Sequence, residues 1–369
     1  MTIGILREPE GENRVSALPE IVAQFIKLKA NVLVEQSAGA RAFASDADYI
    51  NVGAQVADRN QVINSSDMLL SINQPTEQLS NKMLLGVYQP LFNYQQIAQW
   101  AKAGNAVFSI DIIPRTTRAQ AMDVLSSQAN IAGYKAVLLA SASYSRYFPM
   151  FMTAAGSIAP AKMLILGAGV AGLQAIATAK RLGAVVEVFD TRPAVKEEVQ
   201  SLGAKFVEVE GAADASQAGG YAVEQSEDYK QRQQQRIAES VAKADIIITT
   251  AQIPGKKAPI LLTDAMVQSM RNGSVIIDLA AATGGNTNFT KNNESVMVGG
   301  VQIIGNSNLA STMPSDASKM YGKNILNFLK LIINAEGQIH FNFEDDLVKE
   351  TCVAHDGQVS NERVKQLLA

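Results

Sequence analysis

Residues 162–172 read KMLILGAGVAG, an apolar run followed directly by the pattern GxGxxG. The run has the length and apolarity of a buried strand, and the Ala-rich stretch that follows, up to Leu182, has the composition of a helix. Gly167 permits the tight turn between them, Gly169 lets the backbone approach a pyrophosphate, and Gly172 lets the helix pack closely on the strand. The stretch therefore predicts a dinucleotide-binding domain of the doubly wound α/β type.

An acidic residue stands where such a site needs one. Asp190 follows the next expected strand, 185–189, roughly 20 residues beyond the glycine-rich turn. A carboxylate there accepts hydrogen bonds from a ribose 2′-hydroxyl and repels a 2′-phosphate, which favours NAD(H) over NADP(H). Arg192 complicates this preference, because a nearby arginine can bind a 2′-phosphate. A glycine-rich turn without a ligand is the alternative, but the strand, helix and acid together favour an NAD(H) site.

Strands and helices alternate along the chain in two series, which is typical of mostly parallel, doubly wound sheets. At about 150 residues per domain, 369 residues suggest two domains. We predict an α/β protein with two doubly wound parallel-sheet (Rossmann-like) domains around a cleft, formed by residues 1–144 plus 309–369 and by residues 145–308. The expected strands are 3–6, 32–35, 68–72, 84–88 and 106–110, then 162–166, 185–189, 205–209, 246–249, 274–279 and 301–304.

Five other stretches carry their own expectations. Residues 118–142 are rich in small residues and predict one long helix, whereas 148–160 is typical of a loop. Residues 211–236 form a long polar insertion, which in a compact domain is usually a functional lid or a disordered loop. After a helix at 315–334, the tail is expected to be polar, with turns at 336–337 and 356–357.

Composition excludes several classes of protein. The net charge is −3 and no basic cluster with interleaved aromatic residues is present, which argues against a nucleic-acid-binding surface. Cys352 is the only cysteine, so no intrachain disulfide can form, as fits a reducing compartment. The start, MTIGILREPEG, lacks the basic and apolar parts of a signal peptide. The longest apolar run, Met163 to Ala179, carries three glycines and is short for a membrane span, so no span is expected.

The usual catalytic motifs are missing as well. The sequence has no GxSxG, no GxxxxGK[ST] and no Cys/His cluster, so we expect no nucleophile elbow, no phosphate loop of that kind and no metal site. The two histidines, His340 and His355, both lie in the C-terminal tail. Most dehydrogenases move a proton together with the hydride and need a group to do it. An NAD(H)-binding chain without a central acid–base histidine is therefore informative.

Several stretches together resemble the alanine dehydrogenase and NAD(P) transhydrogenase superfamily, over essentially the whole chain. They are residues 4–8, 12–15, 155–184, 253–256, 278–280, 284–286 and the acidic 343–345. Within that superfamily, residues 114–128, PRTTRAQAMDVLSSQ, are similar to the Arg–Gln–Asp loop of the soluble NAD(H)-binding components, or domain I, of proton-translocating transhydrogenases. In that family the loop lies against the nicotinamide end of the nucleotide.

The resemblance implies roles for four residues of this loop. Arg115, Asp123 and Ser126 would hold the nicotinamide and its ribose, and Gln120 would reach toward NADP(H) on a partner component. The spacing of three between Gln120, Asp123 and Ser126 would place them on one face of a helix. The residues alone equally allow a structural interpretation, in which Thr117-x-x-Gln120 is a capping box and Arg115 with Asp123 braces the helix start.

The resemblance also implies nucleotide contacts outside the glycine-rich turn. Residues 219–222, GGYA, resemble the family's mobile loop, whose tyrosine, here Tyr221, closes over bound nucleotide; a plain flexible linker is the alternative. Gln252 and Ala282 depart from the family pattern, which usually has an apolar residue and a longer polar residue there, so both bear on affinity. The candidate NAD(H)-binding residues are Gly167, Ala168, Gly169, Val170, Gly172, Asp190, Thr191, Arg192, Tyr221, Ala251 and Gln252.

Two other functions compete with this interpretation. Alanine dehydrogenase deaminates L-alanine and needs a lysine and a histidine around pyruvate, but the aligned places here carry Asn73 and Gln89. Neither amide can act as an acid or base near neutral pH, and Arg14 alone would bind a carboxylate without doing the chemistry. A non-catalytic NAD-binding module is the third hypothesis, and it predicts nucleotide binding without hydride transfer.

The favoured function follows from the resemblance. NADH bound here would pass a hydride directly to NADP⁺ on a separate NADP(H)-binding component, while a membrane-spanning component absent from this chain translocates protons. The resemblance further implies a homodimer at the cytoplasmic face of a bacterial inner membrane or on the mitochondrial matrix side. Because hydride transfer between two nicotinamides consumes no proton, the protein's task would be positioning, which can lower a barrier by several kcal/mol.

Overall fold

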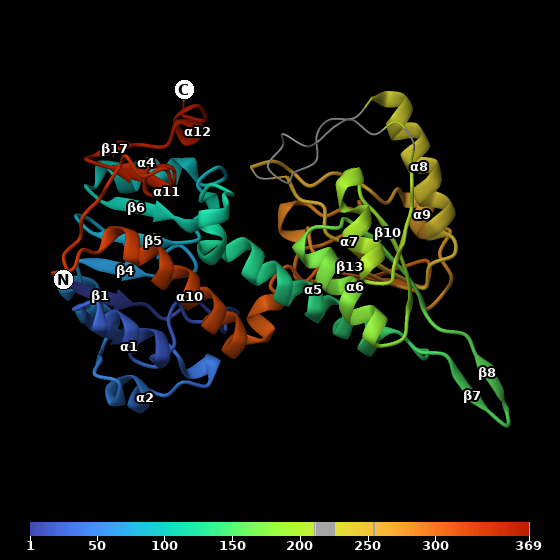
Figure 1. Ribbon diagram of the computed structural model, residues 1–369, viewed down its shortest axis with the longest axis horizontal. Helices are drawn as coiled ribbons and strands as arrows, with labels where there is room; N and C mark the ends of the chain where they lie inside the picture. Colours follow the sequence, from blue (N-terminus) through green and yellow to red (C-terminus); the bar gives the residue numbers. More distant parts are fainter. Residues whose placement is uncertain (210, 212–225, 254, 369) are drawn as a thin grey trace. The chain divides into compact units, whose positions relative to one another are not determined.

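The computed structural model describes residues 1–209, 211, 226–253 and 255–368. The chain folds into two units, unit 1 made of Met1–Gln128 with Ala310–Ala369, and unit 2 made of Ala129–Leu309. The break between Gln128 and Ala129 falls within helix α5 (Val124–Ser143). Each unit is built around its own large sheet with helices on both faces (Figure 1). The α/β class with two mostly parallel sheets is therefore confirmed.

In its described residues, unit 1 holds an eight-stranded sheet of order β17-β16-β6-β5-β4-β1-β2-β3. Strands β1 to β6 pair parallel with one another. Alternate residues of a strand face opposite layers, so Met68 and Leu70 pack on one side and Leu69 on the other. These strands are β1 (Thr2–Ile5), β2 (Asn31–Glu35), β3 (Gln55–Ala57), β4 (Met68–Leu70), β5 (Met83–Gly86) and β6 (Ala106–Ser109).

Two helical layers cover this sheet. Helices α1 (Pro19–Lys27) and α10 (Pro314–Ile332) bury their apolar faces on one side, because their apolar residues recur at helical spacing. Helices α3 (Arg59–Ser65) and α4 (Tyr94–Lys102) cover the other side, where Trp100 of α4 packs edge-on against Tyr88. The short helix α2 (Asp46–Asn51) begins at Ser45 with a capping box.

The C-terminal tail is more ordered than the sequence indicated. It forms α11 (Asp346–Thr351), β16 (Cys352–His355), β17 (Gln358–Val359) and α12 (Glu362–Lys365). Strand β16 pairs antiparallel with β6 and so adds to the edge of the unit 1 sheet. The expected turns at 336–337 and 356–357 are present. The short helices and strands of the tail were not predicted, because the apolar run of β16 is only three residues long and lies among polar neighbours.

The buried thiol on β16 gives a pH dependence to the stability of the chain. Burial raises the pKa of the Cys352 thiol from its ordinary 9.0 to about 11. A group whose pKa is higher in the folded chain stabilises the fold below pH 9.0, and this contribution disappears as the pH rises to about 11. We expect Cys352 to account for a loss of about 2–3 kcal/mol in the free energy of unfolding across that window. Urea denaturation over a pH series should show a shallower loss in Cys352→Ala, and equal losses in both chains would contradict this.

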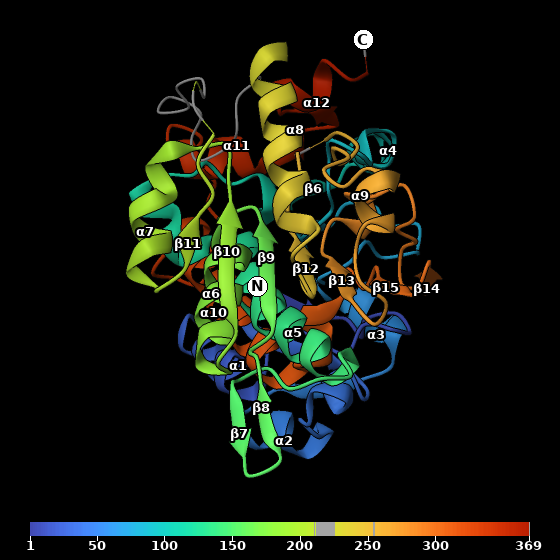
Figure 2. The same cartoon turned by 90° about the vertical axis from the view of Figure 1, so that its right-hand side faces the viewer.

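In its described residues, unit 2 holds a seven-stranded sheet of order β11-β10-β9-β12-β13-β15-β14, which Figure 2 shows in this sequence. All neighbours are parallel except β14 and β15. The strand order reverses between β9 and β12, and ligands of such sheets bind at the carboxyl ends of the strands at this point. The strands are β9 (Lys162–Leu166), β10 (Val185–Phe189), β11 (Lys205–Phe206), β12 (Ile246–Thr249), β13 (Val275–Asp278), β14 (Ser295–Val298) and β15 (Val301–Ile304).

Helices cover both faces of this second sheet too. Helix α6 (Val170–Arg181), α7 (Lys196–Ser201) and the second half of α5 pack on one face, and α8 (Glu227–Val241) with α9 (Asp264–Gln268) on the other. Helix α5 approaches α6 closely at Gly133, where an ideal Cβ would lie 2.1 Å from the carbonyl oxygen of Ala171. No helix in the described part of the chain is both long enough and apolar enough to cross a membrane.

A hairpin replaces the loop expected at 148–160. Strands β7 (Phe151–Thr153) and β8 (Gly156–Ile158) pair antiparallel, and all of their residues are exposed. Figure 1 shows the hairpin projecting from the rest of unit 2. Tyr147 stacks on Phe151 at its base, with ring centroids 4.7 Å apart. The expectation was wrong because side chains that no layer covers leave no periodic burial pattern in the sequence.

Candidate functional site

The glycine-rich turn joins β9 to α6 at the strand-order reversal of unit 2. Gly167 has a φ of +107°, and an ideal Cβ there would lie 2.2 Å from Oγ1 of Thr250. An ideal Cβ at Gly172 would lie 1.9 Å from the carbonyl oxygen of Gly167. This oxygen belongs to the backbone and cannot move aside as a flexible side chain could. The fold itself therefore requires glycine at these two positions.

Gly169 differs from its two neighbours in the motif. Its φ of −77° suits any residue, and within the described part of the chain no atom beyond its two chain neighbours lies within 4 Å of an ideal Cβ. It stands directly before α6, whose first N–H groups receive no side-chain cap. The protein alone gives no reason for a glycine here, whereas a pyrophosphate lying against a helix N-terminus does. The space beside Gly169 thus fits a dinucleotide.

Asp190, directly after β10, is hydrogen-bonded to the glycine-rich turn. Its Oδ2 accepts the Ala168 N–H at 2.7 Å, so the carboxylate lies beside the second residue of the motif. Arg192 forms an ion pair with Asp190, with 2.7 Å between Nη2 and Oδ2, and this hydrogen bonding raises the pKa of the guanidinium. Thr191 lies between them, partly exposed. The structure brings the predicted acidic residue and the predicted turn together.

The loop after β12 carries Ala251 and Gln252, and a buried asparagine holds it. Asn286 accepts the Ala251 N–H at 3.2 Å and donates from Nδ2 to the Ala251 carbonyl at 2.9 Å and the Pro259 carbonyl at 2.8 Å. The N–H of Asn286 donates in turn to Asp278 at 2.6 Å, at the end of β13. The sequence indicated residues 278–280 and 284–286 only through a resemblance. A charged residue at the carboxyl end of a buried strand was the signal that could have identified Asp278.

Gln252 is accommodated by the backbone. Its exposed side chain donates from Nε2 to the carbonyl of Leu279 at 2.8 Å, which adds a second link between the ends of β12 and β13. An apolar residue could not make this bond. The departure from the family pattern at this position therefore has a structural use in this chain.

Asn286→Ala should destabilise unit 2 and weaken nucleotide binding. Asn286 is fully buried, so its loss leaves the backbone groups of Ala251 and the carbonyl of Pro259 without their partner. We expect the free energy of unfolding to fall by about 2 kcal/mol, with weaker binding of NADH. Thermal denaturation and a fluorescence titration measure the two effects. Asn288→Ala, which removes an exposed hydrogen bond to Asp264, is the control, and equal behaviour of the two variants would contradict the role.

A second candidate site lies in unit 1, in a cavity of about 320 Å³ between η2 (Ile110–Ile112) and the start of α5. All four residues that the resemblance assigned to the nicotinamide region line it. The cavity thus gathers a cation, an amide, a carboxylate and a hydroxyl, which together can hold a polar ring and its ribose. Its lining is Ile113, Pro114, Arg115, Thr116, Thr117, Ala119, Gln120, Asp123 and Ser126.

The local structure of this segment differs from the helix expected over 118–142. A 3-10 helix, η3 (Thr117–Met122), is followed by Asp123 in an extended conformation, and α5 begins only at Val124. The break arises because the Asp123 carboxylate accepts the N–H of Ser126 at 2.8 Å and its Oγ–H at 2.6 Å, as an N-cap does. Gln120, Asp123 and Ser126 therefore do not share one face of a single helix. The capping box expected from Thr117 is absent as well, since Thr116 precedes η3 and no side chain caps it.

The remaining predicted residues divide among the units. The glycine-rich turn, Val170, Ala251 and Gln252 belong to unit 2, whereas Arg115, Gln120, Asp123 and Ser126 belong to unit 1. Tyr221 and the rest of residues 212–225 lie outside the described residues.

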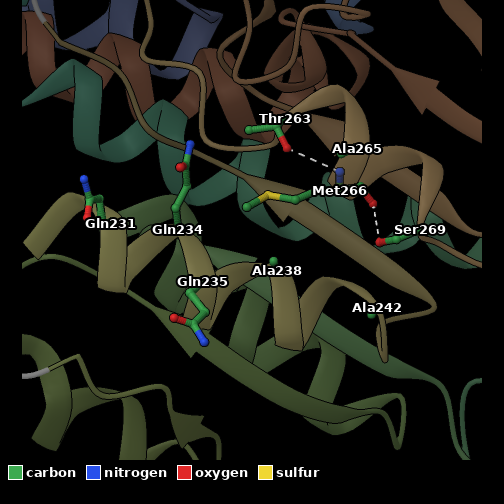
Figure 3. A pocket seen from close by; sticks show the side chains of 9 residues that line it. All are labelled: Gln231, Gln234, Gln235, Ala238, Ala242, Thr263, Ala265, Met266 and Ser269. Carbon is green, nitrogen blue, oxygen red and sulfur yellow. Dashed lines mark hydrogen bonds between the residues drawn. The ribbon is translucent and has the colours of Figure 1, made fainter.

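A larger cavity, of about 500 Å³, lies between α8 and α9 on the outer layer of unit 2 (Figure 3). Its walls combine three glutamines with apolar and hydroxyl side chains, and none of the lining residues is titratable. Such a lining offers neither charge for a phosphate nor an acid–base group. It is formed by Gln231, Gln234, Gln235, Ala238, Ala242, Thr263, Ala265, Met266 and Ser269.

Comparison with known proteins gives consistent matches over both units. The family described as "Alanine dehydrogenase/PNT, C-terminal domain" matches residues 136–362, and "Alanine dehydrogenase/PNT, N-terminal domain" matches residues 4–132. The chain is 43% identical over 378 residues to the first part of NAD(P) transhydrogenase subunit alpha of Rickettsia prowazekii (strain Madrid E), covering 99% of this chain and 98% of that protein.

Solved structures extend the comparison. The crystal structure of transhydrogenase from Sinorhizobium meliloti matches with a TM-score of 0.88 and 42% identity, covering 97% of this chain and 100% of that one. An L-alanine dehydrogenase shares the fold, with a TM-score of 0.80 at 23% identity, over 100% of this chain and 99% of that one. The resemblance inferred from the sequence is confirmed, and the chain belongs to the alanine dehydrogenase/PNT family.

Proposed function

We propose that this chain binds NAD(H) and serves as the NAD(H)-binding component of a proton-translocating NAD(P) transhydrogenase. The near full-length likeness to the first part of NAD(P) transhydrogenase subunit alpha, at 43% identity, carries the proposal. Two features of this chain support it independently. The open space beside Gly169 fits a pyrophosphate, and the cavity at Arg115 and Asp123 offers polar groups without a histidine.

Bound NADH supplies a hydride, which leaves its C4 with both bonding electrons and forms the new C–H bond on the nicotinamide of NADP⁺. NADH is thereby oxidised to NAD⁺ and NADP⁺ is reduced to NADPH, and no free proton appears. The chain's own residues have only to bind and orient. Arg115, Asp123 and Ser126 would hold the nicotinamide and its ribose, and Gln120 would face the NADP(H) of the partner. Asp190 would accept hydrogen bonds from the adenosine ribose.

This function implies partners and a place in the cell. An NADP(H)-binding component would supply the second nucleotide, and a membrane-spanning component would couple hydride transfer to proton translocation. The chain would lie at the cytoplasmic face of a bacterial inner membrane or on the mitochondrial matrix side, as a homodimer.

The exposed hairpin supports the homodimer. Met150, just before β7, Met152 on β7 and Ile158 on β8 are 63%, 73% and 40% exposed, an unusual gathering of large apolar side chains in water. Met152→Asp should shift the chain toward monomer, because a buried unpaired carboxylate would oppose association. Sedimentation equilibrium of this variant measures the shift. Met297→Asp, which alters another exposed methionine on β14, is the control, and a wild-type chain that is already monomeric contradicts the dimer.

A reconstitution experiment tests the main proposal. The chain is mixed with the NADP(H)-binding component of a transhydrogenase, and hydride transfer from NADH to an NADP⁺ analogue is followed by absorbance. Transfer that needs both proteins supports the proposal, and no transfer at saturating nucleotide contradicts it. Nucleotide binding without transfer would favour the non-catalytic NAD-binding module.

The structure argues against alanine dehydrogenase chemistry in unit 1. Asn73 donates to Glu8 from both its N–H and Nδ2 at 3.0 Å, so its amide completes a buried carboxylate site. Arg14 donates from Nε and Nη2 to the two oxygens of Glu12 at 2.8 and 2.6 Å, and from Nη1 to Gln128. The guanidinium is thus engaged inside the protein and is not presented to an amino acid carboxylate. NAD⁺ reduction that depends on L-alanine would contradict this interpretation.

A further inference from the structure

The carboxylate of Asp190 is saturated with protein donors. Oδ1 accepts the Arg192 N–H at 2.8 Å and Nε at 2.9 Å, and Oδ2 accepts the Ala168 N–H at 2.7 Å and Nη2 of Arg192 at 2.7 Å. An ionised carboxylate has about four lone-pair sites. All of them are filled, and only 6% of the Asp190 side chain is exposed.

A ribose hydroxyl can therefore bind Asp190 only if one donor leaves. Two of the donors are backbone N–H groups, fixed by the glycine-rich turn and by the chain after β10. The other two belong to the guanidinium of Arg192, on a flexible side chain that is partly open to solvent, at 18% exposure. The guanidinium is the donor that can be exchanged.

The pair of Asp190 and Arg192 also determines whether the site can bind the 2′-phosphate of NADP(H). Guanidinium binds phosphate bidentately in the same geometry in which it binds carboxylate, so Arg192 could hold a phosphate placed here. As long as Nε and Nη2 of Arg192 both donate to Asp190, this edge of the guanidinium is occupied within the protein and cannot bind a phosphate bidentately. Glu198 on α7 also acts on Arg192 electrostatically and adds a second negative charge nearby. Together the side chains of Asp190, Arg192 and Glu198 carry a net negative charge that disfavours a phosphate.

We propose that Arg192 is a specificity-determining residue: its guanidinium occupies the place on Asp190 that the adenosine ribose of NAD(H) takes, and Asp190 withholds it from the 2′-phosphate of NADP(H). The inference rests on the proposed NAD(H) site. It adds that the arginine is a displaceable competitor of the preferred nucleotide, rather than one of its ligands.

Dissociation constants of NADH and NADPH, measured by nicotinamide fluorescence on the full chain, test this role. Arg192→Ala should bind NADH roughly three- to tenfold more tightly, because no charged hydrogen bond has to be exchanged. Asp190→Asn should bind NADH about tenfold more weakly and NADPH about tenfold more tightly, since it frees Arg192. The double variant should lose the gain for NADPH. Arg271→Ala, which removes another arginine–aspartate pair of unit 2, should leave both constants unchanged.

Several outcomes overturn the role. Weaker NADH binding by Arg192→Ala would show that the arginine is a ligand of the nucleotide. Equal NADPH binding by Asp190→Asn and by the double variant would show that Arg192 does not contribute to selectivity. If Asp190→Asn fails to fold, Arg192→Ala and Arg192→Gln still test the proposed role of Arg192, because both should strengthen NADH binding. A wild-type chain that binds neither nucleotide removes the proposed function together with this role. If the affinities change as expected but no hydride transfer is observed, the role of Arg192 is supported and only the proposed transhydrogenase function is contradicted.

Discussion

Gly169→Ala is expected to leave the stability of the chain unchanged and to remove most of its affinity for NADH. The new Cβ would meet no atom of the described residues within 4 Å apart from its chain neighbours, and the φ of −77° is favourable for alanine. The methyl group would instead occupy the space that a pyrophosphate needs beside the start of α6. Losing one or two charge-assisted hydrogen bonds from backbone N–H groups would weaken binding by about 10- to 100-fold.

Gly172→Ala is expected to act mainly on stability, in contrast to Gly169→Ala, which is expected to act mainly on NADH binding. Its Cβ would lie 1.9 Å from the carbonyl oxygen of Gly167, so α6 must move away from β9. We expect at least about 3 kcal/mol of lost stability, because overpacking against backbone cannot be relieved by a side chain. Thermal denaturation and NADH titration of both variants separate the two glycines. A Gly169→Ala chain that binds NADH as well as the wild type would show that no nucleotide approaches this turn.

The contrast between these glycines marks how far the sequence can predict the nucleotide site. The turn, the helix after it and the acid at Asp190 follow local rules of spacing, so the pattern in 162–190 was sufficient to predict them. The sequence could not indicate that Arg192 fills the carboxylate, since that depends on a side-chain conformation. Asn286 was beyond reach for another reason: its partner Ala251 is 35 residues away, and only the paired ends of β12 and β13 bring them together.

The edges of the sheets show a similar limit. The inner strands are continuous apolar runs and were predicted, whereas β3 and β14 lie at the edges of their sheets and are partly exposed, and β16 has only three apolar residues among polar neighbours. Such short or exposed runs do not stand out from loops in the sequence. The proposed nicotinamide region rests on the resemblance alone, because a carboxylate that ends a 3-10 helix and caps the next helix carries no sequence periodicity.

Asp123→Asn is expected to slow hydride transfer by about 10- to 100-fold without destabilising the chain. The carboxylate uses two of its about four lone-pair sites on the N–H and Oγ–H of Ser126, which leaves acceptors for a ribose or a nicotinamide amide. Asparagine caps a helix as well as aspartate does, so the start of α5 should persist. It presents one neutral acceptor in place of a charged oxygen, and bound nucleotide would be held less firmly in the orientation that transfer needs. Single-turnover absorbance measurements with the partner component give the rate, and thermal denaturation gives the stability.

Asp123→Ala separates positioning from capping. This variant loses the N-cap as well, so its stability should fall by about 1 kcal/mol, while its hydride-transfer rate should fall at least as far as that of Asp123→Asn. Ser126→Ala keeps the backbone N–H that Asp123 accepts and should retain most of the stability. If the carboxylate merely braced the start of α5, the rate would follow stability, and Asp123→Asn would transfer hydride at the wild-type rate. A slow but fully folded Asp123→Asn chain would instead mean that one carboxylate performs both tasks, with Ser126 fixing its orientation from one side and leaving the other side for the nucleotide.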